Sequence, residues 1–177
     1  MKYQDCIGPA QAPDETAAGG ARLADANINA CTGLATDYLN HFNEAIMLLE
    51  MLAACPDCTE DFLAWRPMSY REHFEASRFK GRELAIAAYD AAAADARDGL
   101  DALTATMTVV LEATRAALGI VTAPEAAGNI AGGAAACLKP LIARAGAVIN
   151  GEAEETEDAL STTRQAVVDG LMKQMSA

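Results

Sequence analysis

The sequence predicts an all-α protein, an antiparallel up-and-down bundle of four to five longer helices with an inserted corner of short helices at about residues 59–78. Alanine, the strongest helix former and a poor strand former, is abundant throughout. From about residue 34 onward, apolar residues recur three and four positions apart, which is the helical period. The connectors between these periodic segments are short, and short connectors favour antiparallel neighbours.

The 177 residues are enough for one domain with a real core. Residues 1–22 mix Gly, Pro, Ala, Asp and Thr without apolar periodicity, which predicts a flexible N-terminal tail. Residues 23–177 are then a single helical-bundle domain.

The first long helix is predicted from about Leu34 to Pro56, where proline stops it. One face is apolar: Tyr38, Phe42, Ala45, Ile46, Leu49, Leu52 and Ala53. The opposite side begins polar, with Asp37, Asn40, His41 and Glu44, and we expect it to be solvated there. Because Met47, Leu48 and Met51 follow on that side, the helix is predicted to be buried nearly all round at its end.

Two short helices follow in the predicted corner. Thr59 is positioned to cap one that holds Phe62 and Trp65 and is closed by Pro67. Ser69 and Glu72 have capping-box spacing, which predicts a second helix from Tyr70 to about Ser77.

The long helical pattern over residues 80–118 has a regular apolar seam only in its second half, formed by Leu100, Leu103, Met107, Val110, Thr114 and Ala117. The seam is weak near residues 91–99, and we expect a break between a helix ending near Ala92 and one starting near Asp95.

Thr122 and Glu125 repeat the capping-box spacing, with Pro124 in the first turn of the next helix. Pro140 is expected to kink that helix, and Asn150-Gly151 to end it. A last helix is predicted from Glu152, with acidic residues at its start and a narrow apolar stripe formed by Leu160, Val167, Val168 and Leu171.

The formal charge of −12, from 13 basic and 25 acidic residues, argues against nucleic acid and against an anionic membrane surface as partners. The first twenty residues lack the apolar core of a signal peptide, and five scattered cysteines do not form a disulfide framework. We therefore expect a cytoplasmic protein, and no motif indicates a cofactor.

Any site chemistry is predicted to lie within residues 38–89, which hold eight of the nine aromatic residues and both histidines. Asp37, His41 and Glu44 are spaced i, i+4 and i+7 on one helical face, where they could bind a metal, relay protons or support phosphotransfer at His41. The alternative is a solvated polar face. The aromatic side chains are either a ligand cavity or, as we favour, plain core.

Five of the basic residues fall within seventeen positions: Arg66, Arg71, Arg78, Lys80 and Arg82. Against Glu72 and Glu75 they give residues 66–82 a net charge of +3, which leaves −15 for the rest of the chain. With Tyr70 and His73 nearby, the segment could bind a small anion or an acidic partner. The alternative is that these residues pair with acidic helices of the same bundle.

Cys55 and Cys58 form a C-x-x-C without the strand and helix context of a redox motif. A structural zinc would need two more ligands, and His73 supplies at most one. Two thiols at a helix end are the simpler interpretation.

The leading functional hypothesis is a non-enzymatic binding or regulatory protein that engages a protein partner or a small anionic ligand through the aromatic and basic corner at residues 62–82. A second hypothesis is a phosphotransfer protein or small-molecule enzyme centred on His41 and His73, with Glu44. The third is self-association as a homodimer through the glycine-containing helix at residues 123–149.

Overall fold

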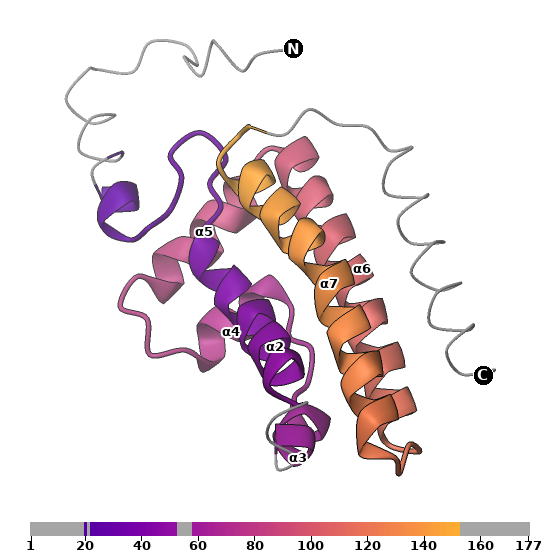
Figure 1. The fold of residues 1–177 in the computed structure, drawn as a ribbon. Coiled ribbons are helices and arrows are strands. Elements are labelled where there is room, and N and C mark those ends of the chain that lie inside the picture. The colour runs from indigo at the N-terminus through magenta and orange to yellow at the C-terminus, as the bar shows by residue number, and fades with distance from the viewer. Residues whose placement is uncertain (1–19, 21, 53–57, 153–177) are drawn as a thin grey trace, which may run out of the picture.

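The computed structural model describes residues 20, 22–52 and 58–152, and within these ranges the protein is helical with no β-strand (Figure 1). A 3-10 helix, η1 (Thr36–Tyr38), leads into α2 (Leu39–Met51). The short helices α3 (Cys58–Ala64) and α4 (Tyr70–Ala76) form the corner, and three longer helices follow: α5 (Arg82–Ala91), α6 (Ala94–Leu118) and α7 (Pro124–Ile149). The prediction of an all-α fold with long antiparallel helices and an inserted corner of short helices is confirmed.

The two longest helices, α6 and α7, pack antiparallel, and α2 packs against α7 (Figure 1). The predicted seam of α6 is buried from Leu100 through Met107 to Ala117. Facing residues of α7 are buried as well: Ile130, Ala131, Ala134, Ala135, Leu138, Leu141, Ala145 and Ile149. Helices α2 to α5 all lie on one side of the α6–α7 pair (Figure 1).

The chain before α2 is a structured loop rather than the start of the predicted helix. The Asn29 side chain accepts hydrogen bonds from the backbone of Cys31 and Thr32, and Gly33 has a φ of +72°. These turns compete with helix formation, so Leu34 is buried in the core without being helical. The Thr32 hydroxyl donates to the carbonyl of Ile149 at 2.6 Å, which joins this loop to the end of α7.

Helix α2 buries its predicted apolar face. On its other sides, however, burial and exposure differ from what we expected. His41 is 6% exposed, so the expectation that it is solvated is wrong. Met47 and Met51 are 52% and 47% exposed, so the expectation that α2 is buried all round at its end is also wrong. The corner covers the side of α2 that holds His41. The exposed side carries Asn40, Glu44, Met47 and Met51.

Local signals at helix ends were partly correct. The Ser69–Glu72 capping box is present, and α5 and α6 are separated at residues 92–93 as predicted. Thr59 is not an N-cap, because α3 already includes Cys58. The Thr122–Glu125 box is also wrong, since α7 begins after Ala123, which has an extended backbone and provides no side-chain cap.

Helix α7 continues through Pro140 and ends at Asn150, followed by Gly151 with a φ of +72°, in agreement with the predicted stop. By length and composition alone α7 could cross a membrane, although it packs against α6 and α2. Residues 1–19, Cys55 and the last predicted helix, beyond Glu152, lie outside the described residues.

Candidate functional site

The corner is attached to α2 by side chains that reach backbone carbonyls. The Tyr38 hydroxyl donates to the carbonyl of Met68 at 2.9 Å. His41 Nε2 donates to the carbonyl of Arg66 at 2.9 Å, and Trp65 Nε1 donates to the carbonyl of His41 at 3.2 Å. The His41 and Trp65 rings also stack, with centroids 4.6 Å apart. These hydrogen bonds and the ring stacking hold residues 65–68 against the first turns of α2.

Both histidines of the chain lie together in this junction. Their ring centroids are 6.0 Å apart, and His73 on α4 also meets Tyr38 edge-on. Burial lowers the pKa of His41, and the neighbouring His73 adds to that effect, while the hydrogen bond to Arg66 opposes it. Burial also lowers the pKa of His73, against the opposing charge of Asp37. Both rings are therefore neutral near pH 7, and His41 carries its proton on Nε2 because a carbonyl can only accept.

Asp37, His41 and Glu44 do not form the predicted metal or proton-relay group. Glu44 is exposed whereas His41 is buried, and the described part of the chain holds no group of three metal-ligating side chains. Asp37 instead turns toward the junction, where its Oδ2 is buried without a hydrogen-bond partner. Of the C-x-x-C pair, the side chain of Cys58, like Cys55, lies outside what the structure describes.

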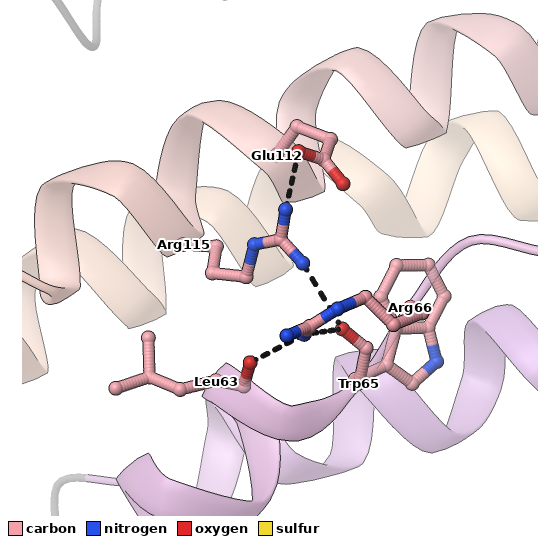
Figure 2. Close-up of polar contacts among 5 residues, drawn as sticks. All are labelled: Leu63, Trp65, Arg66, Glu112 and Arg115. Carbon is pink, nitrogen blue, oxygen red and sulfur yellow. Dashed lines mark hydrogen bonds and ion pairs between the residues drawn. The ribbon is translucent and has the colours of Figure 1, made fainter.

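Arg66 binds the end of the helix that precedes it, α3, rather than an acidic residue. Figure 2 shows the guanidinium groups of Arg66 and Arg115 converging on the carbonyl of Trp65. Arg66 donates to the carbonyls of Leu63 at 2.6 Å and Trp65 at 2.8 Å. Arg115, on α6, donates to Trp65 at 3.3 Å and pairs with Glu112 at 2.6 Å. Cations at a helix C-terminus satisfy its last carbonyls, so this pair caps α3 and ties it to α6.

Arg71 and Tyr70 are also engaged within the protein. Arg71 Nη2 lies 2.7 Å from both carboxylate oxygens of Asp90 on α5, and this contact raises the pKa of Arg71. The buried Tyr70 hydroxyl accepts a hydrogen bond from the backbone of Ala35 at 2.9 Å. Within the predicted cluster at residues 66–82, Arg66, Tyr70 and Arg71 therefore have partners inside the protein.

The remaining three basic residues are Arg78, Lys80 and Arg82, and we call them the basic turn. They differ from Arg66 and Arg71, which are engaged within the protein. All three are exposed in the connection from α4 to the first residue of α5, and none forms an ion pair within the described ranges. This connection projects on the side of the molecule away from α7 (Figure 1).

The basic turn is held by apolar contacts beneath it. Phe79, the residue between Arg78 and Lys80 in the sequence, is half-buried. Its ring centroid lies 5.7 Å from that of Phe74. Gly81 sits so close to Ala26 that a Cβ at this position would lie 2.8 Å from the Ala26 Cβ. The three cations are therefore presented on an anchored backbone.

Sequence reasoning missed two features of this region. Arg115 lies far along the chain from the corner, and no local pattern connects it with Trp65. The burial of His41 did have a local signal, because it is three residues after Tyr38 and four before Ala45, on the edge of the apolar face.

No protein-family model matches this chain, and comparison with the curated proteins and with the solved structures finds no match.

Proposed function

We propose that this chain is a non-enzymatic binding protein of a regulatory kind, which engages an acidic protein partner through the basic turn. One observation carries the proposal. Arg78, Lys80 and Arg82 are three exposed cations within five positions, and no carboxylate of the described residues lies within ion-pair distance of them. In a chain of net charge −12, basic residues left unpaired are available to an outside anion.

The surrounding charge supports an oriented encounter. The rest of the chain has a net negative charge, which on average repels an acidic partner, so the basic turn is the favoured place of approach. Because Phe79 and Gly81 anchor the turn, little backbone freedom remains to be lost on binding. An extended acidic segment can contact all three cations at once, which favours it over a small anion.

The enzymatic alternative is less well supported. Phosphotransfer requires an accessible imidazole nitrogen, whereas His41 is buried and its Nε2 donates to Arg66. His73 is half-buried between Tyr38 and Phe74. We retain the cytoplasm as the proposed location, on composition and cysteine pattern.

A fluorescently labelled decaglutamate peptide tests the proposal by anisotropy, at low and at about 0.15 M ionic strength. We expect salt-sensitive binding that is lost in the variant Arg78→Ala/Lys80→Ala/Arg82→Ala. The matched control is Arg22→Ala/Arg97→Ala/Lys139→Ala, which changes the net charge equally at positions outside the turn. Equal binding by the two variants would mean that total charge, not the basic turn, governs the interaction, and the proposal would be wrong.

A further inference from the structure

Two uncharged imidazole rings lie where the connection between α3 and α4 meets the first turns of α2. This connection, residues 65–68, is not helical. His41 Nε2 donates to the carbonyl of Arg66 at 2.9 Å, and the His41 ring stacks on that of Trp65. The ring centroid of His73, on α4, lies 6.0 Å from that of His41. We call His41 and His73 the histidine pair and residues 65–68 the connecting segment.

The acidic side chains that act on the histidine pair, among the described residues, are Asp37 and Glu44. Asp37, in η1, acts on His73 through its charge, and its Oδ2 is buried without a hydrogen-bond partner. Glu44 acts on His41, but from the exposed side of α2. A proton on His73 is therefore partly compensated by Asp37, whereas a second proton, on His41, meets no buried negative charge within the described part of the chain.

The other titratable side chains around this junction are already engaged. The guanidinium of Arg66 is exposed and turns toward the end of α3. Arg115, on α6, is paired with a carboxylate of its own helix, and Glu72 is held in the capping box of α4. Burial raises the pKa of Tyr38 to about 12, so its hydroxyl stays neutral while it donates to the connecting segment. None of these groups balances a second positive charge on the histidine pair.

Positive charge on both rings is unfavourable while the connecting segment is in place. Two imidazolium groups with centroids 6.0 Å apart repel each other, and the burial of His41 limits the screening by water. Burial accordingly lowers the pKa of both rings. If the connecting segment moves away, both rings meet water and regain the ordinary pKa of about 6.5. The closed arrangement is then fully stabilised above about pH 6.5 and loses this stabilisation as the pH falls toward the lowered values.

The contacts that respond to this charge are confined to the junction. The carbonyls of the connecting segment are held by side chains of other elements, namely Tyr38, His41 and Arg115. The buried rows of α6 and α7, by contrast, contain no ionisable side chain. Proton uptake by the histidine pair therefore acts on the connecting segment and leaves the packing of the two longest helices unchanged.

We propose that the histidine pair is a pH-sensitive switch, which fixes the connecting segment on α2 while both rings are neutral and releases it when each ring takes up a proton from solvent. The release breaks the hydrogen bond from His41 to the carbonyl of Arg66 and separates the rings of His41 and Trp65. It leaves the long helices folded. This inference is independent of the basic turn and of the proposed function.

Trp65 provides a direct readout, because it is the one tryptophan of the chain and is 8% exposed. Acrylamide quenching of its fluorescence measures access of solvent to the ring, which separates release from direct quenching by a protonated histidine. Between about pH 8 and about pH 5, a range that brackets the ordinary histidine pKa, we expect the quenching constant to rise severalfold. Far-UV circular dichroism, measured on the same samples, should retain the helical signal seen at the upper end of the range.

Two variants should move this transition in opposite directions. His73→Phe keeps a ring against Tyr38 and Phe74 but accepts no proton, so it should suppress the rise. Asp37→Asn removes the charge that favours a proton on His73 in the closed arrangement, so the rise should occur at higher pH. Glu44→Gln is the matched control, because it removes the same charge at an exposed position and should change the transition least.

A quenching constant that stays level in the wild type would overturn the proposal. An equal rise in His73→Phe and in His73→Gln, a second variant without a titrating ring, would also overturn it, because release would then not require charge on both rings. A rise that coincides with loss of the helical signal would mean that the whole protein unfolds, and the local switch would be wrong.

Discussion

Replacing Tyr70 with phenylalanine removes one atom from the contact between the corner and the loop that enters α2. The Tyr70 hydroxyl is the acceptor for the backbone N–H of Ala35, at 2.9 Å, and both residues are buried. Burial raises the pKa of Tyr70 to about 12, so the hydroxyl is neutral at ordinary pH and the contact does not titrate. In Tyr70→Phe the Ala35 N–H remains buried without an acceptor.

Leaving a buried donor unpaired costs about 1–3 kcal/mol, and the ring itself is retained. Tyr89→Phe is the matched comparison, since its ring stacks on that of Tyr70 with centroids 4.4 Å apart. The Tyr89 hydroxyl donates to the exposed carboxylate of Asp101 at 2.7 and 2.8 Å, and water can replace that donor. We expect its loss to cost less than about 1 kcal/mol.

Urea denaturation followed by circular dichroism measures both costs. The Tyr70→Phe midpoint should fall well below that of Tyr89→Phe, with the same dependence of the unfolding free energy on urea. If Tyr70→Phe costs no more than Tyr89→Phe, then the Ala35 N–H is not held by Tyr70 in solution, and the assignment of this hydroxyl as an anchor of the corner is refuted.

Two further predictions use the same measurement. Stability should fall as the pH drops below about 6.5, the ordinary histidine value, because the lowered pKa values of His41 and His73 mean that the unfolded chain binds protons the folded chain does not. His41→Gln, which keeps a donor for the Arg66 carbonyl, should reduce the loss of stability at low pH. An unchanged dependence of the unfolding free energy on pH would contradict this prediction. Gly81→Ala should destabilise by about 1–3 kcal/mol, because its Cβ would collide with Ala26. Gly132→Ala, whose Cβ meets nothing within 4 Å, should stabilise α7 by about 0.5–1 kcal/mol, and a loss at both positions would refute the distinction.

The helix boundaries that the sequence predicted correctly depend on interactions within a few residues. Ser69 and Glu72 bond to each other's backbone, so their spacing is sufficient to start α4. The same spacing at Thr122 fails because Ala123 precedes a proline, which disfavours helical backbone at that residue. The helix therefore begins at Pro124, one residue too late for Thr122 to cap it. Both local rules were visible in the sequence, and the proline rule was decisive.

The candidate site was less predictable because its contacts join distant parts of the chain. The sequence placed five basic residues in one cluster, yet their partners divide them into three groups. Arg66 joins Arg115 at the end of α3, Arg71 pairs with Asp90, and the basic turn is left without an internal partner. Periodicity indicates which face of a helix is buried, but it does not indicate which carboxylate or carbonyl another helix brings near.

The two halves of the former cluster also make separable contributions to the proposed binding. Tyr70 holds the corner to the loop before α2, whereas Gly81 and Phe79 hold the basic turn itself. If an anchored turn is what an acidic partner recognises, Gly81→Ala should weaken decaglutamate binding more than Tyr70→Phe does, even where the two variants lose similar stability. Binding that follows stability alone would mean that the whole corner, not the local anchor, sets the geometry of Arg78, Lys80 and Arg82. Binding that ignores both changes would mean that the three charges act without a fixed arrangement, as they would on an unstructured chain.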